Sequence, residues 1–361
     1  MTSRKARPVT VVTDHGHADK FVGVRHRVDA PYLPFRLGAI VRAWRLWRAA
    51  RSAPGHVVVV TYGSLSGFVF CWIQALARPF VKPRVHVMFD LLLERRRGGL
   101  PGLWDRWKAA GFRLSGTCAV VWGMDDGLVF AAEYDLPVER FQFHPYHFTL
   151  DGFEYEIADE GYVFAGGNFG RDYETLVRAL DGIAWPVRVA TTNPSVTSLA
   201  QDSPNVVVEG VTPDEFRRRL ARCRLLVEAH PHDFIRTAGH QTMLNAMRMG
   251  KPIVLADERS APGYFDDGVE GHVVAAGDVE GLRTAVERIL GDDERTARMS
   301  AAARRRVDSP IYGTLEHMQS IYNVALQIHH RREGTETAPV FVEQYGPFSQ
   351  GIMATEELGT R

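Results

Sequence analysis

Short runs of β-branched residues alternate with helix-length amphipathic stretches along most of this chain. The runs at residues 9–13 and 57–62, for example, are each followed by a helical pattern before the next run begins. This alternation is typical of a parallel sheet, because parallel strands need a crossover connection, which is usually a helix. The pattern runs through both halves of the 361 residues, which predicts an α/β protein with two doubly wound, Rossmann-like domains.

The predicted elements divide into two sets. In the first half, strands are predicted at 9–13, 57–62, 84–89 and 118–122, and helices at 36–51, 66–77, 103–111 and 125–134. In the second half, strands are predicted at 162–165, 187–190, 206–208, 225–228, 252–256 and 272–274, and helices at 172–180, 213–221, 239–249, 279–290 and 293–307. We therefore predict domains at 1–155 and 156–309, a helix at 310–330 that returns to the first domain, and a tail at 331–361 that is either disordered or a surface strap.

Charge is divided unequally between the halves, although the whole chain has a net charge of zero. Residues 1–150 carry 21 Lys and Arg against 11 Asp and Glu, a balance of +10, and residues 151–361 carry 22 against 32, a balance of −10. Zero net charge gives no general attraction to nucleic acid, so we expect no nucleic-acid partner. Three widely spaced cysteines and the lack of a signal-peptide pattern favour a cytoplasmic protein, either free or peripheral to the inner face of the membrane.

A glycine-rich loop opens the second half, between a predicted strand and a helix. Gly166, Gly167 and Gly170 let the backbone approach an anion closely, with Asn168 among them, and the helix start presents free N–H groups. Arg171 can pair with a phosphate through two hydrogen bonds. The alternative is a tight turn with Arg171 in solvent.

A second loop with small and polar residues leads into the helix predicted at 239–249. Gly239, His240, Gln241 and Thr242 place backbone N–H groups and side-chain donors at the helix start, an arrangement suited to a diphosphate or to the hydroxyls of a sugar. Asn245 lies at most two turns further on and can face the same site. We therefore predict that these residues bind a ligand.

Two histidines upstream of that helix raise the question of a metal. His230 and His232 form an HxH pattern with Asp233 beside it. This pattern with one nearby acid often occurs without any metal. We expect no metal site here.

In the first half, polar residues follow two of the predicted strands. Asp14 and His15 come directly after the first strand, with His17 two residues on, and Asp90 follows the strand at 84–89. In open α/β sheets ligands bind beyond the carboxyl ends of the strands, so an Asp or His at this place can orient an attacking hydroxyl. The alternatives are a solvated polar turn for the histidines and a cap for Asp90.

The helix predicted from Arg36 to Arg51 is both basic and amphipathic. Five arginines are interleaved with Leu, Ile, Val and two tryptophans, and three more arginines follow at 95–97. Such a helix is typical of a membrane-surface element or of a face that binds an anionic acceptor. The alternative is a helix that packs its tryptophans inward and leaves its arginines in water.

Several spaced motifs of this chain resemble one enzyme family. The segments 247–257 and 266–274, with Gly277 and Asp278, are similar to the carboxyl domain of retaining nucleotide-sugar glycosyltransferases of the GT-B fold, family four. The loop with Gly166, Gly167 and 171–173 resembles the donor-diphosphate loop of that family, 210–212 with Val211 at its centre resembles the loop near the nucleotide base, and 136–141 with Pro145 resembles the segment that closes the amino domain. The resemblance covers about residues 115–307 and fades before them.

This resemblance implies transfer of a sugar from a nucleotide diphosphate to an acceptor hydroxyl, with retained configuration and no bound metal or other cofactor. The donor would bind the carboxyl domain, and a small-molecule or lipid-linked acceptor would bind the amino domain across a cleft. The family places residues facing donor and acceptor after the first strand, where this chain has Asp14 and His15. Arg171 and the helix start at 239–242 would stabilise the charge that grows on the leaving diphosphate.

One departure from the family pattern concerns two glutamates with seven residues between them. At the matching places this chain has Thr237 and Asn245, so hydroxyls of the ligand would meet neutral partners. The departure leaves three interpretations: an active variant that uses 239–242 and Asn245, a degenerate non-catalytic module, or a shifted alignment. The competing functions are therefore a glycosyltransferase, a catalytically silent GT-B protein that binds a ligand or partner, and a nucleotide-sugar epimerase.

Overall fold

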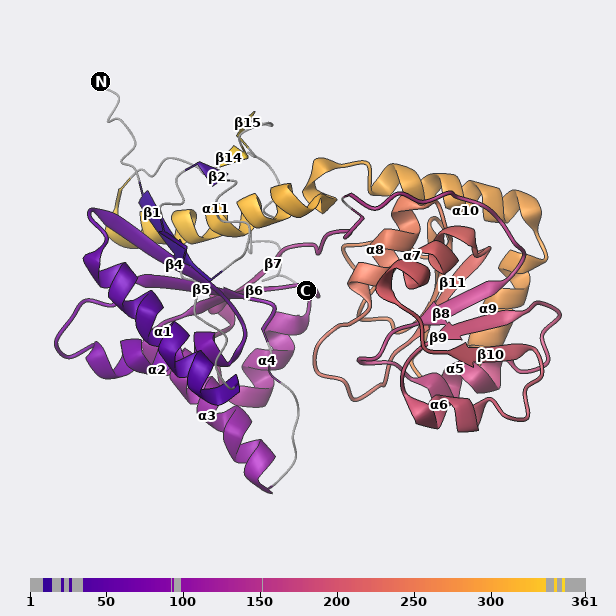
Figure 1. Ribbon diagram of the computed structural model, residues 1–361, viewed down its shortest axis with the longest axis horizontal. Helices are drawn as coiled ribbons and strands as arrows, with labels where there is room; N and C mark the ends of the chain where they lie inside the picture. Colours follow the sequence, from indigo (N-terminus) through magenta and orange to yellow (C-terminus); the bar gives the residue numbers. More distant parts are fainter. Residues whose placement is uncertain are drawn as a thin grey trace. The chain divides into compact units, whose positions relative to one another are not determined.

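The computed structural model describes residues 9–14, 21–22, 26–27, 35–91, 93, 99–150, 152–335, 341–342 and 346–347. The chain divides into two compact units: unit 1 comprises Met1–His144 and Leu315–Arg361, and unit 2 comprises Pro145–Thr314. Each unit is built on a six-stranded parallel sheet with helices on both faces (Figure 1). The prediction of two doubly wound α/β domains is therefore confirmed.

Unit 1 has the strand order β3-β1-β4-β5-β6-β7. Its strands are β1 (Val9–Thr13), β3 (His26–Arg27), β4 (His56–Tyr62), β5 (Val85–Phe89), β6 (Cys118–Val121) and β7 (Phe141–Phe143). Its helices are α1 (Phe35–Ser52), α2 (Leu65–Ala77), α3 (Gly99–Ser115), α4 (Asp126–Tyr134) and α11 (Thr314–Glu333), with the 3₁₀ turn η2 at Val138–Arg140. The first three helices follow one another along one face of the sheet, and α11 covers the other face (Figure 1).

Alternation along the strands of unit 1 explains how one sheet supports two helical layers. Successive side chains of a strand point to opposite faces. In β4, Val58 and Val60 pack with α11 in one cluster, whereas Val57 and Val59 pack with α1 in another. Because both faces are covered, the strands are rich in valine on both sides, as is usual in parallel sheets, and the polar Thr61 and His86 within them are buried as well.

A small antiparallel sheet joins two distant parts of unit 1. Its order is β15-β14-β2, from β2 (Phe21–Val22), β14 (Phe341–Val342) and β15 (Gly346–Pro347). The tail predicted at 331–361 therefore contributes two short strands, and its first residues continue α11 to Glu333. The rest of that tail lies outside the described residues.

Unit 2 has the strand order β10-β9-β8-β11-β12-β13. Its strands are β8 (Val163–Gly166), β9 (Val187–Ala190), β10 (Val206–Glu209), β11 (Leu225–Ala229), β12 (Ile253–Ala256) and β13 (Gly271–Val274). Its helices are α5 (Tyr173–Leu180), α6 (Pro194–Leu199), α7 (Pro213–Arg222), α8 (His240–Arg248), α9 (Val279–Leu290) and α10 (Asp293–Arg306), with the 3₁₀ turn η3 at Pro310–Tyr312.

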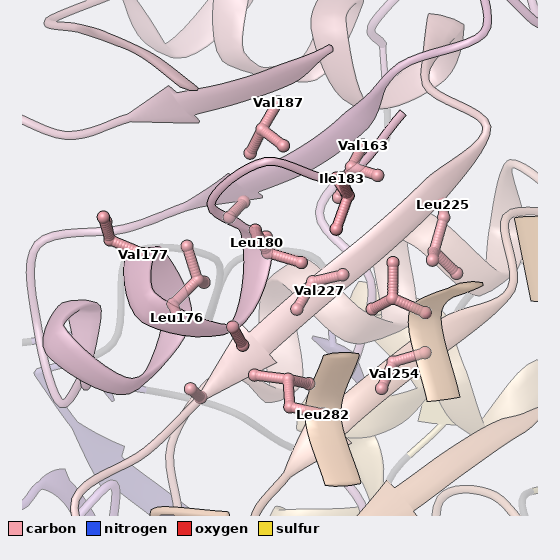
Figure 2. Close-up of a cluster of buried hydrophobic side chains, with 14 of the residues drawn as sticks. Val163, Leu176, Val177, Leu180, Ile183, Val187, Leu225, Val227, Val254 and Leu282 are labelled. Atoms are coloured by element: carbon pink, nitrogen blue, oxygen red, sulfur yellow. The ribbon is translucent and has the colours of Figure 1, made fainter. Parts of the chain in front are cut away.

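The main core of unit 2 lies between its sheet and the layer that contains α5 and α9. Val163 of β8, Val227 of β11 and Val254 of β12 point toward Leu176 of α5 and Leu282 of α9 (Figure 2). All five side chains are buried, so this cluster holds the three central strands in place. The carboxyl ends of these strands carry the loops described below.

Short polar side chains fix where several helices of unit 2 begin. The carboxylates of Asp172, Asp278 and Asp292 each accept a hydrogen bond from a backbone N–H in the first turn of α5, α9 and α10. The Thr212 hydroxyl likewise accepts from the Glu215 N–H of α7. The Glu215 carboxylate in turn accepts from Arg219 Nε at 2.9 Å, one turn further into the helix.

The division between the units lies earlier than the boundary predicted at 155. Tyr146 N donates to Tyr264 Oη at 2.8 Å, and Thr149 N donates to Asn245 Oδ1 at 2.8 Å. These bonds attach the residues after His144 to unit 2. The second division lies at Thr314 rather than at 309, because Phe148 N donates to Tyr312 O and joins η3 to unit 2 as well.

None of the helices within the described ranges is both long enough and apolar enough to cross a membrane.

Candidate functional site

The glycine-rich loop after β8 is folded around the side chain of Arg171. Gly167 has a φ of +122°, a conformation that L side chains rarely adopt, and a Cβ there would lie 3.1 Å from the Arg171 guanidinium. Tyr173 Oη donates to Gly167 O at 2.6 Å, and Arg171 Nε donates to Gly166 O at 2.9 Å. The loop is therefore held in shape by its own arginine and by the first residue of α5.

The guanidinium of Arg171 is buried in an ion pair. Its Nη2 donates to Glu228 Oε1 at 3.0 Å, and the two side chains are only 7% and 1% exposed. Its Nη1 donates to Phe169 O at 3.2 Å and lies 3.2 Å from His230 Nε2. The sequence predicts a phosphate contact for Arg171, and the structure shows these donors directed at protein acceptors.

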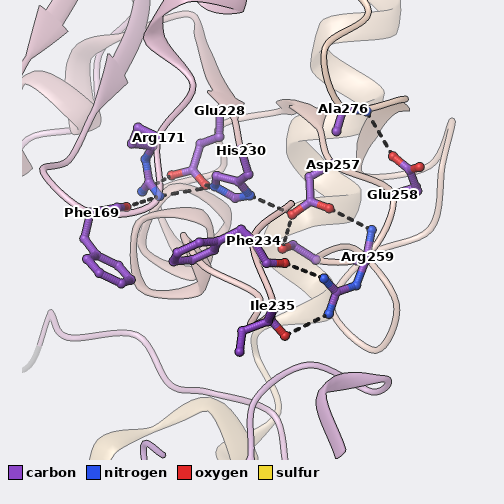
Figure 3. A network of polar contacts seen from close by, with 11 residues as sticks. Phe169, Arg171, Glu228, His230, Phe234, Ile235, Asp257, Glu258, Arg259 and Ala276 are labelled. Atoms are coloured by element: carbon purple, nitrogen blue, oxygen red, sulfur yellow. Dashed lines mark hydrogen bonds and ion pairs between the residues drawn. The ribbon is translucent and has the colours of Figure 1, made fainter. Parts of the chain in front are cut away.

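A chain of polar contacts continues from Arg171 across the ends of β8, β11 and β12 (Figure 3). His230 follows β11, and its Nδ1 lies 2.8 Å from Asp257 Oδ2 at the end of β12. With a proton on Nδ1, the imidazole donates to Asp257 and accepts from Arg171, which satisfies both ring nitrogens. Ser260 Oγ also donates to Asp257 Oδ2, at 2.5 Å.

The charges around His230 shift two pKa values in opposite directions. Burial disfavours the imidazolium, but the hydrogen bonds to Asp257 and Glu228 outweigh burial and raise the pKa of His230. Burial also disfavours the Asp257 carboxylate, but its bonds to His230, Ser260 and the Arg259 N–H lower its pKa to about 2. Asp257 is therefore ionised at neutral pH.

Arg259 fixes the loop between β11 and α8. Its Nη1 donates to Phe234 O at 2.6 Å, and its Nη2 donates to Ile235 O at 3.3 Å (Figure 3). Its backbone N–H donates to the second oxygen of Asp257, at 2.9 Å. One carboxylate thus connects the histidine of this loop with the arginine that holds its middle.

The start of α8 lies against the carboxylate of Glu228. Gly239 has a φ of +82°, and a Cβ there would lie 2.0 Å from Glu228 Oε2 and 2.9 Å from His230. The Glu228 Oε2 atom is buried and lies 3.4 Å from His230 Nε2. Glycine at 239 is thus required twice, by backbone conformation and by the space that Glu228 occupies.

The side chains of α8 that the sequence analysis predicts to bind a ligand do not all point toward one site. His240 is buried and stacks on Tyr264 at 4.2 Å between ring centroids, and burial lowers its pKa to about 3. Gln241 Nε2 donates to Thr149 Oγ1 at 2.8 Å, and Asn245 Nδ2 donates to the same oxygen at 3.2 Å. The side chains of Gln241 and Asn245 therefore hold the segment around Thr149.

Four further predicted positions lie near the same edge of the sheet. The Asn168 carboxamide accepts from Thr191 Oγ1 at 2.8 Å and from Thr192 N at 2.9 Å, which connects the loops after β8 and β9. Val211 is half-buried between β10 and α7, Thr237 is buried, and Thr242 is half-buried in α8. The structure thus brings Gly166, Gly167, Arg171, Gly239 and His230 together, with Asn168 on one side and Asn245 on the other.

Glu228 and Asp257 are the functional candidates that sequence reasoning missed. Glu228 is a charged residue in the otherwise apolar strand LLVEA, where every position is buried. A charge at such a place needs a partner, which is the feature that could have found it. His232 is exposed and does not join His230, and no cluster of metal-ligating side chains occurs among the residues described.

In unit 1, the corresponding edge of the sheet holds Asp14. Its carboxylate accepts from Tyr62 N at 3.3 Å and from Ser66 Oγ at 3.4 Å. Burial raises the pKa of Asp14 to about 6, against the opposing effects of the Tyr62 N–H and of Arg42. Such a carboxylate gains and loses its proton close to neutral pH. His15 and His17 lie outside the described residues.

Asp90 ends β5 at the same edge and has a left-handed backbone, with a φ of +54°. Trp122 Nε1 donates to its carboxylate at 3.4 Å. A Cβ on Gly63 would lie 2.3 Å from Asp90 O, so the loops after β4 and β5 touch through their backbones. Asp14 and Asp90 therefore lie at the carboxyl ends of two strands that flank β4.

Comparison with known proteins gives one family match and many fold matches. Residues 241–306, from the first turn of α8 to the end of α10, match the family model of glycosyl transferases group 1. A search of curated proteins found no sequence match to the chain.

Solved structures resemble the chain over most of its length. Sucrose-phosphate synthase from Thermosynechococcus elongatus superposes with a TM-score of 0.63 at 14% identity, covering 91% of this chain and 99% of that one. Anabaena Alr3699/HepE in complex with UDP gives 0.60 at 13%, covering 91% and 100%. WaaG, a glycosyltransferase involved in lipopolysaccharide biosynthesis, gives 0.52 at 18%, covering 90% and 99%. The chain has the fold of GT-B glycosyltransferases, and its unit 2 carries the segment that matches the family model.

Proposed function

We propose that this protein is a retaining glycosyltransferase that moves a sugar from a nucleoside diphosphate sugar to an acceptor hydroxyl. One observation carries the proposal: the family match begins in the first turn of α8, two residues after Gly239, which packs on Glu228 and His230. The segment similar to known transferases and the polar network of unit 2 therefore meet at one helix start.

In this reaction the bond from the anomeric carbon to a diphosphate oxygen breaks, and a bond from that carbon to the acceptor oxygen forms. The acceptor hydroxyl loses its proton, and negative charge grows on the leaving diphosphate. In unit 2 the groups suited to that charge are the backbone N–H groups at 168–171 and in the first turn of α8, since the N–H groups of Gly167 and Asp172 already donate to Ala190 O and Ala229 O. The proposal needs no metal, because these groups supply the electrostatic stabilisation.

We assign the donor to unit 2 and the acceptor to unit 1. Structures of Anabaena Alr3699/HepE are described in complex with UDP and with UDP-glucose, so a uridine nucleotide is the first donor to test here. For the acceptor we assign Asp14, because its pKa of about 6 leaves it ionised and able to accept a proton at neutral pH. Replacement by Asn should lower kcat about 100-fold or more if Asp14 is that base.

Arg171 contacts the diphosphate only if its ion pair with Glu228 opens. The single change Arg171→Ala leaves a buried carboxylate without a partner and so confuses lost function with lost stability. The double change Arg171→Gln with Glu228→Gln removes both charges and keeps a hydrogen-bonding pair. A double variant that folds like the parent but transfers sugar more slowly supports a charge role, and an unchanged rate assigns the pair to structure.

The decisive assay measures release of nucleoside diphosphate from UDP-, GDP- and dTDP-sugars with and without candidate acceptors. Release that depends on an acceptor supports transfer, and the anomeric configuration of the product tests retention. Interconversion of two donors without release would instead identify a nucleotide-sugar epimerase.

A catalytically silent module is the second candidate, and specific contacts favour it. The Arg171 guanidinium is paired internally, and Asn245, where the family has a glutamate, binds Thr149. Nucleotide binding by thermal shift without turnover in any donor and acceptor combination would support this candidate.

A further inference from the structure

The outward side of the layer formed by α1, α2 and α3 in unit 1 is apolar where a solvated layer is normally polar. In α1, Ala43, Leu46 and Ala50 face the sheet and are buried. The opposite stripe of the helix begins with Leu37, Ile40 and Trp44, which are 61%, 52% and 48% exposed. Spacings of three and four residues place these three side chains on one outward line.

The same stripe of α1 turns basic toward its end. Arg48 and Arg51 continue the line and are exposed, and the Arg48 guanidinium lies over the Trp44 ring, 5.5 Å from its centroid. No Asp or Glu occurs anywhere in α1. A helix that is stabilised only by surface ion pairs would carry both signs, so this composition points to a partner that supplies negative charge.

Helix α2, which contacts both α1 and α3, contains no charged residue in its 13 positions. Leu76 is 69% exposed. Val69 is half-buried and packs against the cluster that contains Leu46 of α1, and Trp72 is half-buried and donates to Trp107 O of α3. The apolar outward side of α1 therefore continues onto its neighbour.

Helix α3 extends the apolar side further. Leu100 and Leu103 are exposed, and Trp107 lies one turn on along the same line. Trp107 stacks between Trp104, at 4.8 Å between centroids, and Trp72 of α2, at 5.9 Å. The three tryptophans form a continuous row that ends at the exposed edge of Trp104.

We propose that this outward side of α1, α2 and α3 is the surface by which unit 1 binds a bilayer that contains anionic lipids. The apolar side chains would enter the boundary between headgroups and acyl chains, the tryptophans would lie at headgroup level, and the arginines would pair with lipid phosphates. Charge complementarity favours this occupant: residues 35–115 carry 14 Lys and Arg against three Asp and Glu, a net charge of +11.

Flotation of the full chain with vesicles tests the proposal without donor or acceptor, so it stands or falls independently of the proposed transfer. We expect the protein to float with phosphatidylcholine–phosphatidylglycerol vesicles at low salt and much less with phosphatidylcholine alone. The double variant Ile40→Glu with Leu103→Glu should abolish flotation. The matched control Leu199→Glu with Val269→Glu changes two exposed apolar positions of unit 2, at 44% and 49%, and should float like the parent.

The contribution of charge to vesicle binding is tested with a second double variant, Arg48→Gln with Arg51→Gln. At ~1 kcal/mol for each basic residue near an anionic surface, this variant should bind the anionic vesicles about 25-fold more weakly. Its control is Arg304→Gln with Arg305→Gln, which removes the same charge from exposed positions at the end of α10.

Three results would overturn the proposal. The parent could stay with the lipid-free fraction at low salt, or the Ile40→Glu, Leu103→Glu variant could float as well as the parent while showing the same circular dichroism. A self-association that light scattering detects and that this double variant abolishes would instead assign the surface to contact between copies of the chain.

Discussion

The two units share one architecture but differ in how their outer helices meet solvent. In unit 2, Arg219 of α7 pairs with Glu215 and with Glu209 of β10, and Arg217 pairs with Asp214, so acidic side chains lie beside these arginines. In unit 1, all charged residues of α1 are arginines, and α2 contains no charged residue. The difference shows that part of the positive charge of the first half of the sequence is concentrated on α1.

The carboxyl edges of the two sheets differ as well. In unit 2, Arg171, Glu228, His230 and Asp257 connect three strand ends through contacts of 2.8–3.2 Å. In unit 1, Asp14 is held by two longer bonds of 3.3 and 3.4 Å and keeps a raised pKa. One edge is held by a continuous network of polar contacts, and the other keeps a carboxylate that can change its protonation state.

The largest effect is expected from breaking the unit 2 network. Glu228→Ala leaves the buried Arg171 without its carboxylate, and removing one partner of a buried pair costs about 3–5 kcal/mol of unfolding free energy. Denaturant unfolding followed by circular dichroism measures this loss. Glu294→Ala removes the exposed partner of Arg298 in α10 and should cost less than ~1 kcal/mol, so equal losses would refute the special role of the buried pair.

A smaller loss is expected where α8 begins. Gly239→Ala combines a left-handed backbone with a Cβ that collides with Glu228, whereas Gly268→Ala has a similar φ of +78° and open space around it. The control should lose about 1–2 kcal/mol from backbone strain alone, and Gly239→Ala should lose clearly more. If thermal unfolding shows the same loss for both, Glu228 is not held against the glycine.

The smallest effect concerns Asp14. Its raised pKa makes stability fall as pH rises, whereas the lowered pKa of Asp257 in the unit 2 network makes stability fall as pH decreases. The folded pKa of Asp14, about 6, lies above the ordinary 3.8, so the folded state retains a proton that the unfolded chain has lost. The stability of unit 1 should therefore fall as pH rises from about 4 to about 6, by at most ~3 kcal/mol, and Asp14→Asn should remove this dependence.

Tryptophan fluorescence can assign that change to unit 1. Six of the seven tryptophans belong to unit 1, and Trp185 is the one in unit 2. Unfolding that fluorescence reports should shift with pH in the parent and not in Asp14→Asn. A parallel shift in both would remove Asp14 as the titrating group.

Most of the fold follows from sequence because each strand and helix carries its own periodicity. Val9–Thr13 and Val279–Leu290 have the predicted bounds, since β-branched runs and amphipathic spacing are local signals. β7 and α6 were missed because FQF has three residues without a β-branched side chain and PSVTSL is only six residues long. α3 begins at Gly99, earlier than predicted, because Pro101 is tolerated in a first turn.

The location of the candidate site residues at the strand ends could be predicted from the sequence, but their side-chain partners could not. Strand-end logic located Asp14, the loop at 166–171 and the start of α8. It could not show that Arg171 pairs with Glu228, 57 residues away, or that Asn245 binds Thr149, 96 residues away. Such pairings depend on how distant strands are ordered in the sheet, and local sequence does not contain that order.

The route of the chain between the units has a consequence for synthesis. Unit 2 is one continuous segment, whereas unit 1 needs Leu315 and the rest of α11, which supply Met318, Ile321, Tyr322 and their neighbours to one face of its sheet. On a ribosome, unit 2 can fold once its last residue has emerged, whereas Val9, Val11, Val58 and Val60 stay exposed on one face of the unit 1 sheet until α11 is made. His56 of β4, for example, contacts His329 of α11, which lies 273 residues later in the chain. The sheet of unit 1, although it is made first, is thus the last part of the protein to complete its core.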